Sequence, residues 1–191
     1  MNCKWKGYTR SFLSVGLTSF TSSVIIRVIM EPKLKIYLDT SIPSALYDYS
    51  KPIRQIITQK WFENDANDYL LFTSTLTLNE IEEMKNIDKR QLILDLIKDS
   101  KVSILDIDQP SQDLANIYHK NGAIPKSEPE DALHVAIAVV NNIQILASWN
   151  FKHLVSVNPI LKINEVNRQK KLSSIEIVSL EQLGGYKYGN L

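Results

Sequence analysis

Short apolar runs alternate with longer segments of helical periodicity along this chain, and the alternation limits the folds open to it. Five runs have the length and apolar content of buried strands, at residues 35–38, 69–74, 102–107, 143–148 and 175–178. Helical patterns occupy residues 44–48, 52–64, 77–84, 88–98, 110–121, 129–140, 160–171 and 180–183. We therefore expect one α/β domain with a central, mostly parallel sheet and helices on both faces.

The first expected strand ends abruptly at Asp39, which Thr40 and Ser41 follow. In an open parallel sheet, ligands bind in the crevice outside the carboxyl ends of the strands. Asp39 is therefore a candidate metal ligand. The same position also suits an acid that only caps the next helix, because Asp is a preferred N-cap residue. Other acids at the same edge would favour the first interpretation.

Glu80 and Asn150 are expected at that edge as well. Glu80 follows the strand at 69–74, and its spacing from Thr77 matches a capping box at the start of a helix. Asn150 follows the strand at 143–148, where its amide suits a metal-bound water, a phosphate oxygen or the turn itself. Each residue thus has a purely structural interpretation beside the functional one.

The helical pattern at 129–140 carries a third acid. Residues 127–130 match a capping box with proline in the first turn, and Asp131 follows directly. Apart from Asp131 and His134, residues 131–140 are apolar nearly all round, which predicts deep burial. A charge at the entrance of a buried helix is costly unless it is paired, and a cation would compensate Asp131 better than the helix dipole alone. His134 lies one turn further on the same face, either as a satisfied semi-buried group or as another ligand.

Three acids at one edge constrain the chemistry of the site. Carboxylates clustered in a dry pocket repel one another, so Asp39, Glu80 and Asp131 would not stay ionised together without a cation. Mg²⁺ and Mn²⁺ prefer oxygen ligands. With such an ion, a bound water becomes a nucleophile and the developing charge of a phosphodiester is neutralised. The pattern therefore predicts metal-assisted phosphodiester hydrolysis.

The net charge and the cysteine content limit which binding partners and which cellular compartment we expect. A net charge of +1 gives no global attraction to nucleic acid or membranes, so any polyanion site must be a local patch. The single cysteine, Cys3, excludes an internal disulfide framework and a cysteine-rich zinc site. The low cysteine content fits a reducing compartment, so we expect a cytoplasmic protein.

Residues 1–30 differ from the rest of the chain because they contain no Asp or Glu and are rich in Ser and Thr. A signal or transit peptide is one interpretation. However, Arg27 interrupts the apolar run before it reaches the ~20 residues of a membrane span, so we expect no membrane segment. The favoured interpretation is that Met30 is the true start. We thus expect an N-terminal extension over 1–30 and a folded domain over 31–191.

Four short motifs, taken in order, resemble those of the PIN-domain nucleases, particularly the VapC-type toxin ribonucleases. The motifs lie at residues 37–41 (YLDTS), 77–81 (TLNEI), 129–136 (PEDALHVA) and 148–154 (SWNFKHL), and the match extends over about 34–183. The resemblance implies a PIN-like three-layer α/β/α fold over the 31–191 domain. It also implies an endoribonuclease that depends on Mg²⁺ or Mn²⁺, acts on RNA and is blocked by a cognate antitoxin. Family members commonly form homodimers.

The resemblance places the first three acidic positions of the family on Asp39, Glu80 and Asp131. The fourth position, often Asp, is Asn150 here, and an acid common just beyond it is replaced in the 152–153 region. This loss should weaken a second metal site, leaving a one-metal mechanism or reduced activity. Thr40 or Ser41 would position a water or phosphate.

Two other interpretations compete with the toxin ribonuclease. A haloacid-dehalogenase-like phosphatase also begins with Asp after the first strand, but it needs a second Asp where Ser41 stands. A catalytically inactive PIN-like module that binds RNA or a protein partner is the better rival, and Asn150 favours it. The three remaining acids oppose it, because a module that only binds a polyanion gains nothing from clustered negative charge.

Overall fold

The computed structural model describes residues 32–183 of the chain. The expected N-terminal extension over 1–30 lies outside the described residues. None of the helices within 32–183 is long and apolar enough to cross a membrane.

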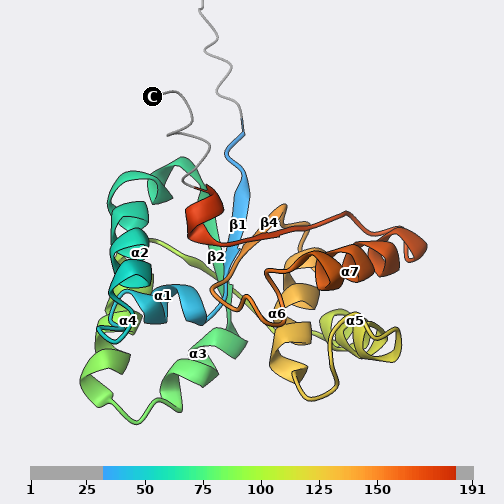
Figure 1. The fold of residues 1–191 in the computed structure, drawn as a ribbon, viewed down its shortest axis with the longest axis horizontal. Helices are drawn as coiled ribbons and strands as arrows, with labels where there is room; N and C mark the ends of the chain where they lie inside the picture. The colour runs from blue at the N-terminus through green and yellow to red at the C-terminus, as the bar shows by residue number, and fades with distance from the viewer. Residues whose placement is uncertain (1–31, 184–191) are drawn as a thin grey trace, which may run out of the picture. The chain divides into compact units, whose positions relative to one another are not determined.

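A five-stranded sheet forms the centre of the described domain (Figure 1). Its strands are β1 (Lys35–Leu38), β2 (Leu70–Ser74), β3 (Ser103–Leu105), β4 (Ile145–Ala147) and β5 (Glu176–Val178). The spatial order is β3-β2-β1-β4-β5, and every neighbouring pair is parallel. Tyr37 of β1 is in register with Phe72 on one side and with Leu146 on the other. The expected parallel sheet is confirmed, with β1 at its centre.

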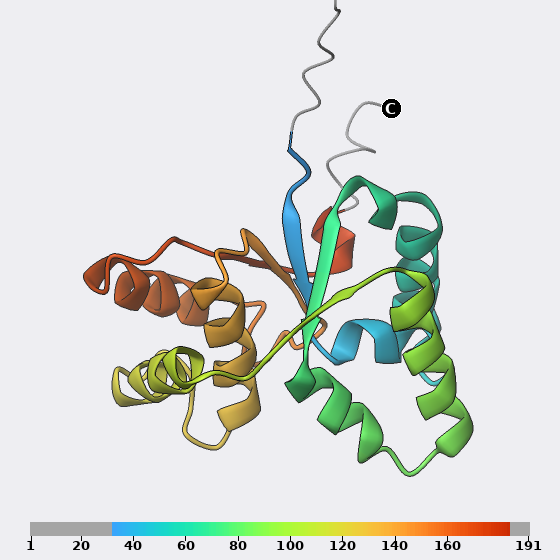
Figure 2. The same ribbon diagram turned by 180° about the vertical axis from the view of Figure 1, so that it is seen from behind.

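Helices cover both faces of the sheet, so the fold has the expected three α/β/α layers (Figure 2). The helices are α1 (Ser41–Ala45), α2 (Pro52–Asn64), α3 (Thr75–Glu82), α4 (Ile87–Asp99), α5 (Gln109–Lys120), α6 (Pro129–Val140) and α7 (Val157–Gln169), with a 3₁₀ turn, η1 (Ala66–Asp68). One layer contains α5, α6 and α7, and the other contains α1, α2 and α4. A last helical segment over 180–183 packs on the second layer's side.

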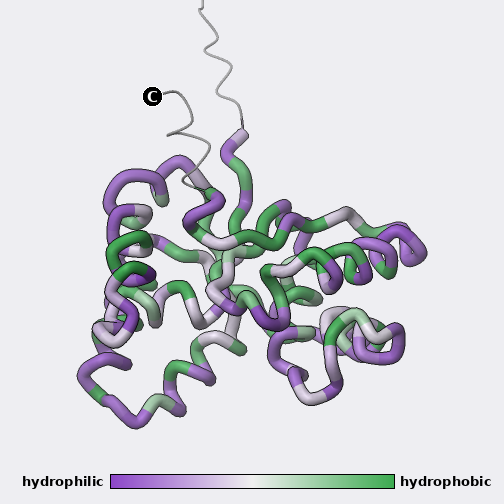
Figure 3. The backbone as a smooth tube through the Cα atoms, viewed as in Figure 1, coloured by the Kyte–Doolittle hydropathy of each residue, from purple (hydrophilic) through white to green (hydrophobic). Residues whose placement is uncertain are grey.

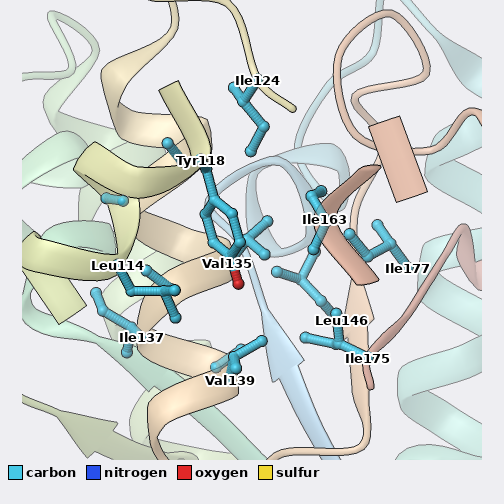
Figure 4. Close-up of a cluster of buried hydrophobic side chains, with 14 of the residues drawn as sticks. Leu114, Tyr118, Ile124, Val135, Ile137, Val139, Leu146, Ile163, Ile175 and Ile177 are labelled. Carbon is cyan, nitrogen blue, oxygen red and sulfur yellow. The ribbon is translucent and has the colours of Figure 1, made fainter. Parts of the chain in front are cut away.

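Alternation of side chains along β1 divides the core between the two layers. Tyr37 points into a cluster shared with α5, α6 and α7, whereas Ile36 and Leu38 point into a cluster shared with α1 and α2. Figure 4 shows the first cluster, in which Val135 of α6 lies beside Leu146 of β4. Hydrophobic residues are concentrated along the central strands, and the outer turns are mostly hydrophilic (Figure 3).

Helix α6 is buried as deeply as its sequence predicts. Its residues from 132 to 139 are all buried except Leu133, which is half-buried. An almost wholly apolar helix cannot leave one face in water without exposing hydrophobic area, so α6 fits between the sheet and α5. The consequence for the site is that any polar group on α6 must find its partners inside the protein.

Two predicted capping boxes are wrong. Helix α3 begins at Thr75 with Ser74 as its N-cap, so Thr77 lies inside the helix and is buried. Helix α6 has Glu128 as its N-cap, without any side-chain capping bond, because Ser127 lies one residue too early. In both places the spacing matches the motif, but the chain enters the helix at another residue.

The apolar side chains of α2 are only partly used in the core. Trp61 is buried, but Ile53 is 76% exposed and Ile56 is 51% exposed. Helix α1 begins at Ser41 rather than at Ser44, because the chain turns into the helix directly after β1. The sheet lies against the end of α2 that carries Trp61, which leaves the first turns outside the core.

Candidate active site

Four polar residues predicted for the site lie around the carboxyl end of β1. Asp39 directly follows β1, Asn150 follows β4, Glu80 belongs to α3 after β2, and Asp131 lies in the first turn of α6. The backbone N–H of Asp39 donates to the carbonyl of Ala147 at 3.3 Å, which joins the ends of β1 and β4. Parallel strand ends share one edge of a sheet, so residues more than 100 positions apart meet there.

Asp39 is 4% exposed and is held by the start of α1. Its Oδ1 atom accepts hydrogen bonds from the backbone N–H of Ser41, at 3.0 Å, and from the Ser41 hydroxyl. Ser41 Oγ in turn accepts from the backbone N–H of Trp149 at 2.8 Å. Burial raises the pKa of Asp39, and the charge of Glu80 raises it further, against hydrogen bonds from the hydroxyls of Ser148 and Ser41. Asp39 therefore assists the helix start and also belongs to an acidic cluster.

Glu80 is held by two donors from other elements. Its Oε2 atom accepts a short hydrogen bond from the Thr40 hydroxyl and lies 3.1 Å from Nε2 of His134. Burial by itself raises the pKa of this half-buried carboxyl, but the contacts with His134 and Thr40 outweigh burial, so the pKa lies below its usual value. Glu80 is consequently the acid of the cluster that is most firmly ionised.

Asp131 and Asn150 form a direct pair. Asn150 Nδ2 donates to Asp131 Oδ2 at 2.8 Å, and Asn150 Oδ1 accepts from the backbone N–H of His153 at 3.2 Å. The amide thus stabilises its own turn and orients the acid. Burial raises the pKa of Asp131 to about 6, with a further contribution from the charge of Asp39, and the hydrogen bond from Asn150 acts in the opposite direction.

His134 is buried, and both of its ring nitrogens have partners. Nδ1 lies 2.7 Å from the Tyr37 hydroxyl, and Nε2 faces Glu80. The Tyr37 hydroxyl is also 2.6 Å from Ser74 Oγ. The interpretation of His134 as a satisfied buried group is confirmed.

Sequence reasoning missed Tyr37 and Ser74, which lie beside the acids. The signal for Tyr37 was its position, because a tyrosine in the middle of a central strand buries a hydroxyl that needs a partner. His153 also has a partner, since its Nε2 lies 3.3 Å from Glu128. The identity of these partners depends on contacts between elements far apart in the chain.

The carboxylate oxygens of the site are the type of ligand that a hard divalent cation prefers. Asp39 and Asp131 are carboxylates with raised pKa values, and a cation beside them would offset the cost of ionising both. The three predicted ligands do not form a ready cage: within residues 32–183 there is no group of three or more His, Cys, Asp or Glu side chains arranged to hold a metal ion. Mg²⁺ is commonly bound through one or two carboxylates with waters completing its shell, so two acids suffice.

Fold and site together define a class of protein: a three-layer α/β domain with an acidic cluster at the carboxyl edge of a parallel sheet. A sequence model of the PIN domain matches residues 36–152, which are more than half of the chain. The chain belongs to the PIN domain family. The match includes Asp39, Glu80, Asp131 and Asn150.

Two solved structures are among those similar to this chain. VapBC2 of Rickettsia felis, bound to a DNA fragment from its promoter, has 16% sequence identity and a TM-score of 0.46, with 76% of this chain and 98% of that chain covered. VapC20 of Mycobacterium tuberculosis, a sarcin-ricin loop cleaving toxin, has 16% identity and a TM-score of 0.45, with 58% of this chain and 86% of that chain covered. No curated protein matches the chain.

Proposed function

We propose that this protein is a divalent-metal-dependent endoribonuclease that hydrolyses RNA phosphodiester bonds. The observation that carries the proposal is the proximity of Asp39 and Asp131 at the strand edge, where the charge of Asp39 raises the pKa of Asp131. Packing alone gives no reason to bring a buried acid and a half-buried acid together, because each makes the other harder to ionise. A cation-binding site does give such a reason.

Each side chain then has a distinct task. Asp39 and Asp131 would hold Mg²⁺ or Mn²⁺, and Glu80 would orient the ion or the attacking water. When bound, the cation supplies a nucleophile at neutral pH and offsets the charge that develops on the phosphate. Thr40 and Ser41 position these groups through their bonds to Glu80 and Asp39. Asn150 fixes the orientation of Asp131.

Asn150 supports a mechanism with one cation rather than two. Its amide N–H₂ faces Asp131, and its oxygen is occupied by the turn at His153, so it offers no charge to a second ion. Loss of an acid at this position weakens binding of a second divalent ion, because ligand charge sets much of its affinity.

Membership of the PIN family and the resemblance of the motifs support a toxin role, with a cognate antitoxin as partner, a homodimeric assembly and a cytoplasmic location. A small antitoxin-like reading frame next to this one would support the pairing. If the neighbouring frames encode nothing of that kind, a solitary nuclease becomes the better description.

A second candidate is an inactive PIN-like module that binds RNA or a protein without cutting. Asn150 favours this candidate, because its amide is uncharged and its oxygen is already bonded to the backbone N–H of His153. The absence of a three-ligand cluster within residues 32–183 also favours it. Binding without cleavage would then persist when the acids are changed.

Cleavage assays on two acid variants separate these functions. The purified protein is incubated with structured RNAs in Mg²⁺ or Mn²⁺, beside Asp39→Asn and Asp131→Asn. We expect each variant to lose roughly 100-fold or more in cleavage rate while keeping its circular dichroism spectrum. Glu130→Gln is the matched control, because Glu130 adjoins Asp131 on α6 but is exposed.

Three outcomes decide between the candidates. Loss of cleavage in both acid variants, with normal cleavage by Glu130→Gln, supports the nuclease. Equal cleavage by all proteins, or cleavage that persists in chelator, contradicts the assigned site. RNA binding without cleavage by the wild-type protein supports the inactive module.

A further inference from the structure

A chain of buried polar groups reaches Glu80 from inside the protein. It runs from Ser74 Oγ to the Tyr37 hydroxyl at 2.6 Å, then to His134 Nδ1 at 2.7 Å. His134 Nε2 lies 3.1 Å from Glu80 Oε2 and completes the chain. The four residues come from the end of β2, the middle of β1, the second turn of α6, and α3. The chain therefore links β2, β1 and α6 to the Glu80 carboxylate on α3.

His134 is an exception on its helix. The neighbouring buried positions of α6 are filled by alanine, valine and isoleucine. An imidazole among them costs free energy unless both nitrogens are hydrogen-bonded, and an apolar side chain would fill the space without that requirement. The packing of α6 therefore supplies no reason for a histidine, whereas contact with an acid of the site does.

The donors along the chain run in one direction. The Tyr37 hydroxyl stays protonated, because burial raises its pKa. One arrangement of donors satisfies every group: Ser74 donates to the Tyr37 oxygen, Tyr37 donates to His134 Nδ1, and His134 Nε2–H donates to Glu80. In this arrangement Tyr37 holds the imidazole with Nε2 directed at Glu80.

Both hydrogen bonds to Glu80 converge on the same oxygen. Thr40 and His134 donate to Oε2, and no hydrogen bond to Oε1 occurs within residues 32–183. The side chain of Glu80 is 28% exposed, against 4% for His134, so the carboxylate lies between the buried chain and solvent. Because Oε2 is already hydrogen-bonded to Thr40 and His134, Oε1 is the oxygen that is available to the site.

We propose that His134, held by Tyr37, is a positioning residue that fixes the Glu80 carboxylate for the cleavage reaction. The inference rests on the proposed function and assigns Glu80 to orienting the bound cation. His134 itself touches neither substrate nor cation. Its effect is transmitted entirely through Glu80.

Three substitutions test the inference. His134→Leu removes the donor to Glu80, and Tyr37→Phe removes only the group that holds the imidazole. His134→Gln keeps an N–H donor near the position of Nε2. We expect His134→Leu to lower the cleavage rate and the Mn²⁺ affinity by roughly 10- to 100-fold. Tyr37→Phe should give a smaller loss, and His134→Gln should recover most of the activity.

A double-mutant cycle shows whether His134 acts through Glu80. If it does, His134→Leu added to Glu80→Ala costs no further activity, because the group it positions is already absent. Additive losses would overturn the inference. Tyr118→Phe is the matched control for Tyr37→Phe, because it also removes a buried tyrosine hydroxyl, one that is bonded to Asn167 at 2.6 Å and not to the chain that reaches Glu80. It should lower stability without changing cleavage.

Cation binding is measured separately, as the rise in Tm produced by Mn²⁺. A smaller rise in His134→Leu than in wild type supports the inference, and an equal rise overturns it. If His134→Leu does not fold, the comparison is made with Tyr37→Phe and His134→Gln. If the wild-type protein cleaves no RNA, the proposed function fails, and the Mn²⁺ comparison still decides whether His134 positions Glu80.

Discussion

Asp131 and Glu80 are both partly buried acids of one cluster, yet their pKa values are shifted in opposite directions. Burial dominates at Asp131, where a single amide donor faces the carboxyl, and its pKa rises to about 6. At Glu80 two donors share one oxygen and outweigh burial, so the pKa falls. The difference follows from hydrogen bonding to the charged form.

The raised pKa of Asp131 predicts a pH dependence of stability. The folded protein binds this proton more tightly than the unfolded chain, whose Asp titrates at 3.8. The contribution of this proton to the free energy of unfolding is fully present below about pH 4 and is lost as the pH rises through about 6. We expect a loss on the order of 1 kcal/mol after solvent screening, measured by urea unfolding in chelator.

Asp131→Asn provides the reference for that measurement, because it cannot titrate at this position. The free energy of unfolding of wild type should fall relative to the variant between pH 4 and pH 7. Parallel curves for the two proteins would show that Asp131 has an ordinary pKa.

At the scale of elements, α5 packs on α6 and is capped at both ends. Its N-cap Asp108 accepts from the backbone N–H of Ser111 at 2.9 Å, and the Ser111 hydroxyl accepts from the N–H of Asp108 at 3.2 Å. At the other end, Asn121 is the C-cap and Gly122 follows with φ of +62°. Glycine suits the position after the C-cap, since it adopts this left-handed conformation readily.

Asp108→Ala should destabilise the protein by about 1 kcal/mol, because it removes the acceptor for the first orphan N–H groups of α5. Chemical denaturation measures the change. Asp113→Ala is the control, because Asp113 is exposed inside the same helix and caps nothing. Equal stability of Asp108→Ala and wild type would mean that water replaces the cap without cost.

At the scale of the whole domain, the strand edge is held in place by the core on both faces of the sheet. Leu146 of β4 is fully buried beneath α6, directly beside Tyr37 of β1. The helix that carries Asp131 and His134 therefore rests on the same strands whose ends carry Asp39 and Asn150. The geometry of the site depends on this packing.

Leu146→Ala should lower the free energy of unfolding by about 2–5 kcal/mol, because it leaves a cavity between α6 and the sheet. We expect one cooperative transition, at a lower urea midpoint. Leu161→Ala on α7 is the control, since Leu161 is 63% exposed and should cost less than about 0.5 kcal/mol. Similar losses in both variants would contradict the layered core.

Periodicity alone predicted the order of the elements, the parallel sheet and the burial of α6, because these depend on short-range patterns that the chain carries locally. It also predicted that Asp39, Glu80, Asp131 and Asn150 would come to one edge, since strand ends coincide in any parallel sheet. It failed where the local pattern allowed the helix to begin at more than one residue, as at Thr77, which lies inside α3 and not at its start.

Only the tertiary structure decided which partner each polar group takes. Tyr37 and His134 are 97 residues apart, and no pattern within either segment identifies the other. The same holds for Thr40 with Glu80, 40 residues apart. Burial makes a hydrogen bond obligatory, but the choice of partner is made by the distances between packed elements, and those distances are fixed by the core as a whole.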